Sequence, residues 1–150
     1  MKNNDENVEV ISRIFRAIEH RDPETMAALL HPDAEFVWPS SLPYGGTWRP
    51  GAPTHPSWGE TWTPLQPTEA ERRMDPRVVA AGPDEAVVIW RQRGKGPNGE
   101  AFDSEVLGLY RFIDGKLARG QMFYFDPEGA ARFLARARAQ EVPQSTVQEE

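Results

Sequence analysis

The sequence predicts an α+β fold in which helices pack against one face of a curved antiparallel sheet. Apolar residues recur at helical spacing near the N-terminus, whereas the C-terminal half holds several runs rich in apolar, aromatic and β-branched residues. The clearest is the stretch from Leu107 to Asp126, where two such runs flank Asp114-Gly115. That dipeptide suits the positive φ angles of a tight turn, so the stretch predicts a long hairpin. Helices followed by antiparallel strands indicate the α+β class.

Two helices are predicted before the first strand. The first covers about residues 6–20, because apolar residues recur there at helical spacing. These residues are Val8, Ile11, Phe15 and Ile18. The second begins after Asp22, a good N-cap, with Pro23 at the first helical position. It ends near Leu30, since the residue before Pro32 avoids the helical conformation.

The rest of the chain is predicted to form the sheet and a closing helix. Strands are expected at residues 34–38, 72–80, 86–93, 102–113 and 116–125. Residues 40–67 are rich in proline and read as a loop, with a short helix near residues 58–62. The last helix runs from Pro127 to about Ala139. We expect residues 1–140 to form a single domain and residues 141–150, which lack periodicity, to be a disordered tail.

The composition excludes several classes of function. The formal net charge of -6 argues against nucleic-acid binding, which needs clustered Lys and Arg. The absence of Cys excludes disulfides, thiol catalysis and Cys-ligated metals. No pair of histidines has the spacing of metal ligands, so neither a metal nor another cofactor is expected. No apolar run is long enough to span a membrane and the first residues lack a signal-peptide core, so a cytoplasmic location without membrane binding is expected.

Three stretches together resemble a known superfamily. They are His31-Pro32-Asp33-Ala34-Glu35, Tyr44-Gly45-Gly46-Thr47-Trp48 and the hairpin that ends at Phe125-Asp126. In this order they resemble the nuclear-transport-factor-2-like superfamily, which includes the SnoaL-like and ketosteroid-isomerase-related proteins, over residues 6–139. The resemblance implies a cone-shaped, cystatin-like barrel whose sheet wraps around the N-terminal helices. It also implies a pocket for a small hydrophobic molecule and assembly as a homodimer, but no particular reaction.

Two enzyme branches of this superfamily are disfavoured by the residues at the matching positions. Ketosteroid isomerases use a tyrosine and two aspartates, and the positions that match them hold Ile14, Trp38 and Gly108. Limonene epoxide hydrolases carry an aspartate where this chain has Phe123, and no acid accompanies the arginine within residues 87–91. The polyketide cyclases remain, because they need only a shaped apolar pocket and one or two acid–base groups.

Three residues are candidates for a catalytic role. Arg91 shares a strand face with Ile89; facing inward it could hold a carboxylate or polarise a carbonyl, and otherwise it is an edge or interface arginine. Glu35 alternates with Val37; among aromatic residues its pKa would rise and suit acid–base work, and otherwise it faces solvent. Tyr44 offers a hydroxyl that could donate a proton to a substrate oxygen.

Three other acidic residues are not expected to take part in catalysis. Asp126 could be a catalytic acid at the end of a strand, but the run Asp126-Pro127-Glu128 favours an N-cap for the last helix. Asp103 and Glu105 are expected to face outward, on the side of the sheet where dimers of the superfamily often pack.

The strongest signal for a binding site is aromatic. Trp38, Trp48, Trp58 and Trp62 are predicted to bind substrate, as a semi-rigid lid over the cone; the alternative is that they fill the cone as core. The hairpin is expected to add an apolar wall through Gln121, Phe123 and Phe125.

These observations favour a small enzyme that acts on a hydrophobic, oxygenated metabolite. A polyketide cyclase or isomerase of antibiotic biosynthesis, which relies on pocket shape and few acid–base groups, is the leading hypothesis. A non-catalytic protein that binds such a ligand is the alternative, and a dimerisation or scaffold domain would have its tryptophans in the core.

Overall fold

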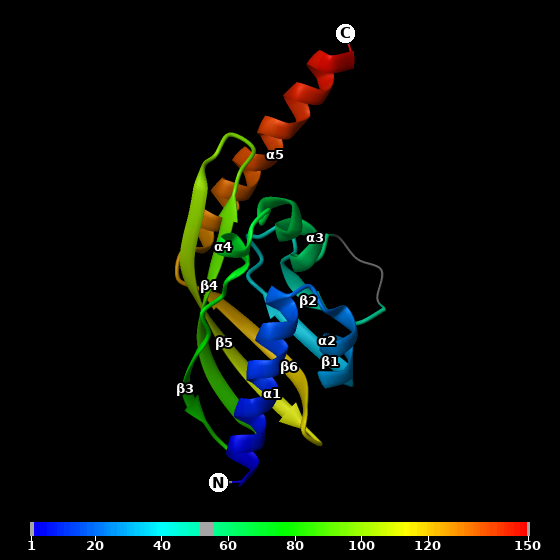
Figure 1. The fold of residues 1–150 in the computed structure, drawn as a ribbon, viewed down its shortest axis with the longest axis vertical. Helices are drawn as coiled ribbons and strands as arrows, with labels where there is room; N and C mark the ends of the chain where they lie inside the picture. The colour runs from blue at the N-terminus through cyan, green and yellow to red at the C-terminus, as the bar shows by residue number, and fades with distance from the viewer. Residues whose placement is uncertain (1, 52–55, 150) are drawn as a thin grey trace.

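The computed structural model describes residues 2–51 and 56–149. Its helices are α1 (Lys2–Glu19), α2 (Pro23–Leu29), α3 (Trp58–Trp62), α4 (Glu69–Arg72) and α5 (Pro127–Glu149), with a short 3-10 helix, η1 (Thr63–Leu65). Its strands are β1 (Leu30–Trp38), β2 (Gly46–Trp48), β3 (Arg77–Ala81), β4 (Glu85–Lys95), β5 (Ala101–Ile113) and β6 (Lys116–Tyr124). Figure 1 shows α1 lying across the sheet and the end of α5 projecting beyond it.

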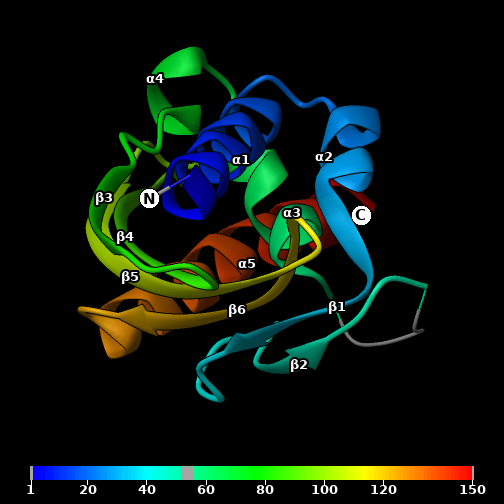
Figure 2. The same ribbon diagram turned by 90° about the horizontal axis from the view of Figure 1, so that it is seen from below.

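One curved sheet organises the described residues. Its strand order is β2-β1-β6-β5-β4-β3. Neighbouring strands are antiparallel except β1 and β6, which run parallel. The predicted α+β fold with a curved sheet around the N-terminal helices is therefore confirmed, with one parallel pair added. Figure 2 shows the sheet curving around α1 without closing, so that β2 and β3 form its two edges.

Helix α1 fills the concave side of the sheet. Its buried face carries Ile11, Ile14 and Phe15, at the spacing that predicted the helix. The Phe15 ring meets Trp90 of β4 and Tyr110 of β5, with centroids 6.1 and 6.3 Å away. These contacts between rings at a tilt are favourable and bury much apolar area. They hold the helix at a fixed distance from the centre of the sheet.

Side-chain amides fix the start of α1. Asn7, only 4% exposed, donates from Nδ2 to the Pro83 carbonyl at 2.8 Å. Asn4 donates in the same way to the Ala81 carbonyl at 3.1 Å. Both acceptors lie at the connection between β3 and β4, so the helix is attached to the end of that hairpin.

The segment before β4 differs from the sequence prediction. Residues 72–80 were expected to form one bent strand, but the chain makes the short helix α4 and then β3. Thr68 and Glu71 form a capping box, with Glu71 Oε1 accepting from the Thr68 backbone N–H at 2.8 Å, and this starts the helical turn. Asp75 then adopts a φ of 45°, in the left-handed region, between α4 and β3.

Helix α5 begins as predicted and continues further. Its buried face consists of Ala130, Phe133, Leu134 and Ala137. The predicted end near Ala139 is replaced by a helical backbone to Glu149, where the sequence analysis expected a tail without regular structure. Residues 134–142 contain neither Gly nor Pro and are rich in Ala, Arg and Gln, all good helix formers. The helix therefore continues through this run, beyond the buried residue Ala137.

No helix among residues 2–51 and 56–149 is both long and apolar enough to cross a membrane.

Replacing Asp126 tests its assignment as a helix cap. Asp126 Oδ1 accepts a hydrogen bond from the Gly129 backbone N–H at 2.9 Å. Asp126→Ala removes this acceptor and should lower the free energy of unfolding by about 1 kcal/mol, measured by urea denaturation. Asp126→Asn keeps a side-chain oxygen and should retain most of the stability. Equal stability of the alanine variant and the parent protein would contradict the cap assignment.

Candidate functional site

A cavity of about 220 Å³ lies between α1 and the concave face of the sheet. For comparison, an engineered apolar cavity of roughly 150 Å³ takes up benzene. The space therefore suits a molecule of one substituted ring or two small fused rings. The lining residues are Ile14, Phe15, Ile18, Met26, Phe36, Trp38, Trp48, Ser57, Trp58, Gly59, Met74, Trp90, Tyr110, Leu117 and Met122.

Strand alternation selects which residues of the sheet reach this cavity. Along β4, every second residue from Ala86 to Gly94 is buried, and Trp90 is the one that lines the cavity. Tyr110 does so from β5 and Met122 from β6. Successive side chains of a strand point to opposite faces, so the residues between these positions cannot contribute.

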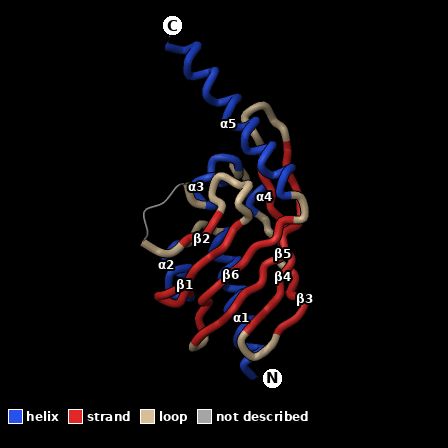
Figure 3. Tube along the Cα trace, turned by 180° about the vertical axis from the view of Figure 1, so that it is seen from behind, coloured by secondary structure: helices blue, strands red, loops and turns tan. Residues whose placement is uncertain are grey.

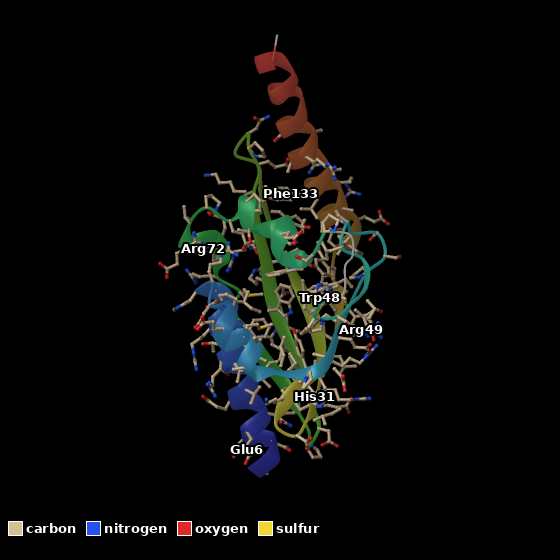
Figure 4. The ribbon with its side chains drawn as sticks, turned by 90° about the vertical axis from the view of Figure 1, so that its right-hand side faces the viewer. Glu6, His31, Trp48, Arg49, Arg72 and Phe133 are labelled. Atoms are coloured by element: carbon tan, nitrogen blue, oxygen red, sulfur yellow. The ribbon has the colours of Figure 1, made fainter. Side chains whose placement is uncertain are left out.

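Three of the four predicted tryptophans form one wall of the cavity. Trp38 and Trp58 are stacked, with centroids 6.1 Å apart and planes 9° apart. Trp48 packs on Phe36 with centroids 5.8 Å apart. Figure 4 shows Trp48 toward the middle of the molecule and its neighbour Arg49 near the outer edge. The placement of Trp38, Trp48 and Trp58 agrees with a binding role, which remains a prediction.

The orientation of Trp58 is fixed by a buried amide. Its Nε1–H donates to Gln92 Oε1 at 2.6 Å, and Gln92 is only 1% exposed. The same oxygen lies 3.4 Å from the Tyr124 hydroxyl, which donates to it. A buried polar group with partners on both sides holds one geometry, because any other rotamer would leave donors unpaired. Gln92 thus positions part of the cavity wall without lining it.

Trp62 lies in the core instead of the cavity, which corrects its predicted role. It is fully buried and stacks on Phe133 of α5, with centroids 5.9 Å apart and planes 9° apart. Phe102 of β5 completes this cluster. The sequence left open whether these tryptophans form a lid or fill the core. Trp62 belongs to the core, whereas Trp38, Trp48 and Trp58 line the cavity.

Tyr44 also lies outside the cavity lining. Its hydroxyl is 2.6 Å from the Tyr124 hydroxyl and accepts a hydrogen bond from Trp62 Nε1 at 2.9 Å. Burial raises the pKa of Tyr44, which keeps the hydroxyl protonated. The tyrosine predicted as a proton donor to substrate is thus engaged in a buried network with protein partners.

Glu35 and Arg91 are on the outer face of the sheet, so the inward alternative for both is wrong. Glu35 precedes Phe36, which lines the cavity, and its carboxylate pairs with Arg119 at 3.0 Å and Arg49 at 2.6 Å. Arg91 follows Trp90 and pairs through Nε with Asp103 at 2.7 Å. Alternation of side chains along the strands directs each charge away from the cavity. On the outer face, water and a partner of opposite charge stabilise it.

The apolar wall predicted for the hairpin was assigned to the wrong face of the strand, because the inward-facing residues are one position away from the predicted ones. Met122 and Tyr124 are buried, whereas Phe123 and Phe125 are 47% and 58% exposed on the other face. Gln121 is half-buried on that outer face too, and its Oε1 accepts from Arg119 at 3.3 Å. Both alternating sets on this strand are apolar, so the sequence pattern alone does not distinguish the inner from the outer face.

Two polar side chains of the central strands that line the cavity, Trp90 and Tyr110, were not among the residues predicted from the sequence. A signal for Tyr110 is present in Gly108, two residues earlier on the same face of β5. A Cβ at Gly108 would overlap the Tyr110 ring and hydroxyl, so glycine makes the room that this ring occupies. Burial raises the pKa of Tyr110, so it is a neutral donor at physiological pH.

The cavity has no charged side chain among its lining residues. Its polar groups are indole N–H groups and the hydroxyls of Ser57 and Tyr110. Nor does the described part of the chain hold three or more His, Asp or Glu side chains arranged to bind a metal ion. Such a site can bind and shape a neutral molecule and can donate hydrogen bonds to it.

The three tyrosines predict a loss of stability at alkaline pH. Tyr44, Tyr110 and Tyr124 are the chain's only tyrosines, all are buried, and burial raises the pKa of each above its unfolded value of about 10. The folded protein therefore keeps protons that the unfolded chain releases. This stabilisation is complete below pH 10 and is lost above it, at about 1.4 kcal/mol per pH unit for each tyrosine.

Urea unfolding at pH 8, 10 and 11 measures this loss. Tyr110→Phe should reduce the slope of stability against pH by about one third, since one of three contributing groups is removed. An unchanged slope in Tyr110→Phe would show that the Tyr110 hydroxyl titrates equally in both states.

Solved structures with the same fold support the topology. A protein of unknown function with a cystatin-like fold from Xanthomonas campestris is 24% identical, with a TM-score of 0.69, covering 85% of this chain and 97% of its own. A candidate SnoaL-like polyketide cyclase from Jannaschia sp. CCS1 is 17% identical, with a TM-score of 0.60, covering 83% of this chain and 89% of its own. TerC, co-crystallised with polyporic acid, is 20% identical, with a TM-score of 0.55, covering 79% and 91%. At these identities the likeness establishes the fold alone.

No curated protein matches the chain significantly. The family model of the SnoaL-like domain, however, matches residues 11–120, which run from α1 into β6 and include most of the cavity lining. The chain therefore belongs to the SnoaL-like domain family, within the nuclear-transport-factor-2-like superfamily.

Proposed function

We propose that this protein is a small-molecule enzyme of the cyclase or isomerase type, whose substrate is a compact, neutral, oxygenated hydrophobic molecule. The observation that carries the proposal is the 220 Å³ cavity between α1 and the sheet, with its aromatic wall. A polyketide as substrate, antibiotic biosynthesis as the setting and the cytoplasm as the location are the finer parts of this proposal.

The lining supports the choice of a neutral substrate. A charged group in this cavity would lose its hydration and meet no opposite charge among the lining residues, which costs several kcal/mol. Aromatic and thioether side chains instead favour flat apolar surfaces, and Met26, Met74 and Met122 adapt to different outlines. The TerC complex with polyporic acid shows that a distant structural neighbour holds a small organic molecule.

Catalysis in this proposal rests on conformation. When a flexible substrate folds against Trp38 and Trp58, its reacting atoms are brought together. Binding then supplies the ordering that makes the uncatalysed cyclisation entropically costly. Arg91 and Glu35 are left out of the mechanism because their charges lie on the outer face. Tyr44 is left out because its hydroxyl is satisfied by Tyr124 and Trp62.

Ligand binding without turnover is the second candidate. It is favoured by one observation: no carboxylate or imidazole is among the lining residues, so the described cavity has no ordinary general base. A carrier or sequestering protein would need only the apolar walls.

Turnover of a short linear poly-β-ketone thioester tests the proposal. The protein should accelerate cyclisation above the rate in buffer, followed by liquid chromatography with mass detection. Ile18→Trp should fill the cavity from α1 and reduce the rate more than about tenfold, because excluding roughly 100 Å² of apolar ligand surface forfeits about 2.5 kcal/mol. Arg13→Trp, on the exposed side of the same helix, is the matched control and should retain activity.

Binding of the ketone without acceleration would favour the carrier. Cyclisation by Ile18→Trp at the parent rate would exclude the cavity as the site.

We also propose that the outer face of the sheet forms a homodimer. Leu107 of β5 stands in register between Ile89 of β4 and Phe123 of β6, giving an apolar row across three strands. Phe123 and Phe125 are about half exposed on this face. Figure 3 shows that no described helix covers the lower part of this face. Contiguous apolar surface of this kind favours association.

A charge on this face should separate the subunits. Phe123→Glu is expected to sediment as a monomer, because dimer formation would bury an unpaired carboxylate. Ile113→Glu, on an exposed apolar residue next to the hairpin turn, is the control and should remain dimeric. A monomeric parent protein in analytical ultracentrifugation would refute the proposed dimer.

A further inference from the structure

Two hydrogen-bond donors on the cavity wall lack a good acceptor. The Tyr110 hydroxyl donates to Met122 Sδ at 3.6 Å, and a thioether sulfur is a weak acceptor. Trp90 is only 2% exposed, and its Nε1–H has no hydrogen-bond partner among the described residues. A buried donor without an acceptor costs stability, so its retention needs a reason.

The two side chains share one neighbour. Both rings contact Phe15 of α1, with centroids 6.1 Å from Trp90 and 6.3 Å from Tyr110, so they lie on the same side of the cavity. Trp90 and Tyr110 come from neighbouring strands, β4 and β5, and both line the cavity. Phe15 packs on both rings and limits their movement.

The backbone makes room for this arrangement. A Cβ at Gly108 would overlap the Tyr110 ring and hydroxyl. A Cβ at Gly120 would come within 3.1 Å of Tyr110 Cδ1 and Met122 Cε. Two glycines therefore keep the tyrosine ring flat against the sheet, with its hydroxyl beside Met122 instead of out in water.

From these contacts we propose that Tyr110 and Trp90 bind one acceptor oxygen of the ligand, donating to it from the Tyr110 O–H and the Trp90 Nε1–H. This deepens the proposed function and rests on it, because it assumes a ligand in the same cavity. It names the ligand class: a molecule with a carbonyl oxygen at the end of an apolar ring, such as a cyclic or aryl ketone.

The donor pair also gives the site a chemical capability. Two hydrogen bonds to a carbonyl oxygen withdraw electron density from its carbon and stabilise an enolate that forms next to it. They act without a charged residue, in surroundings where water does not compete. Carbon–carbon bond formation at a ketone and enolisation both benefit from this polarisation.

A pair of isosteric probes isolates the acceptor oxygen. Acetophenone carries C=O where α-methylstyrene carries C=CH₂, so both fill the cavity alike and only the ketone can accept. Calorimetric titration should show the ketone binding more tightly to the parent protein. Tyr110→Phe should weaken acetophenone binding about three- to tenfold and leave α-methylstyrene binding unchanged, as expected for loss of one hydrogen bond. Trp90→Phe also removes part of the lining, so it should instead lower the preference for acetophenone over α-methylstyrene by a similar factor.

The indole N–H signals give an independent readout. The chain has five tryptophans and so five such signals in a nitrogen-15 correlation spectrum. The signal absent from Trp90→Phe identifies Trp90, and acetophenone should move it downfield while α-methylstyrene should not. Thr47→Val, which removes a hydroxyl from an exposed residue of β2 outside the cavity lining, is the control and should bind both probes like the parent protein.

The outcomes separate this proposal from the proposed function. Binding of both probes with equal affinity, or equal losses for both in Tyr110→Phe, would overturn the donor pair while leaving the cavity as a binding site. Failure of the parent protein to bind either probe would count against the cavity itself, and the donor pair would fall with it.

Discussion

The alternation of side chains along β4, β5 and β6 determines everything else about this site. Each residue of these strands points either toward α1 or away from it, and a shift of one position would exchange the two sets. In the observed register the inner set includes Trp90, Tyr110 and Met122, and the outer set includes Arg91 and Phe123. The contact of Phe15 with Trp90 and Tyr110 fixes which face meets the helix. The cavity, its neutrality and the exposed outer face all follow from that choice.

This constraint explains which expectations from the sequence hold. Local signals were sufficient for most of the elements, because a cap such as Asp126 or a turn such as Asp114-Gly115 acts within a few residues, but they did not predict β2 or α4. The family resemblance supplied the curvature of the sheet and its wrapping around the N-terminal helices, whereas the strand order comes from the structure. The facing of β6 could not be found in the same way, since Met122, Phe123, Tyr124 and Phe125 are all apolar or aromatic and support either face. The chemistry of a residue such as Glu35 does not reveal which face of its strand it lies on, and Glu35 pairs with Arg49 and Arg119 on the outer face.

The buried polar network shows how an uncharged site can still be well defined. A series of hydrogen bonds runs from the core to the cavity wall and joins, in this order, Trp62, Tyr44, Tyr124, Gln92 and Trp58. Each group is satisfied by the next, so the wall is held by directional bonds as well as by packing. Tryptophans that look equivalent in the sequence therefore divide into a core member and wall members. Only their partners, which lie far away along the chain, distinguish them.

The glycine beneath Tyr110 has a consequence for how such a cavity can change. Gly108 touches no ligand space itself, yet it sets the depth at which the tyrosine ring rests. A larger residue at position 108 would displace the Tyr110 ring toward α1 and so reduce the volume of the cavity without itself lining it. The size of molecule that the fold accepts can thus be adjusted by substitutions in a layer beneath the lining, while the surface chemistry presented to the molecule stays the same. Diversification of substrates within one scaffold can proceed through such hidden positions.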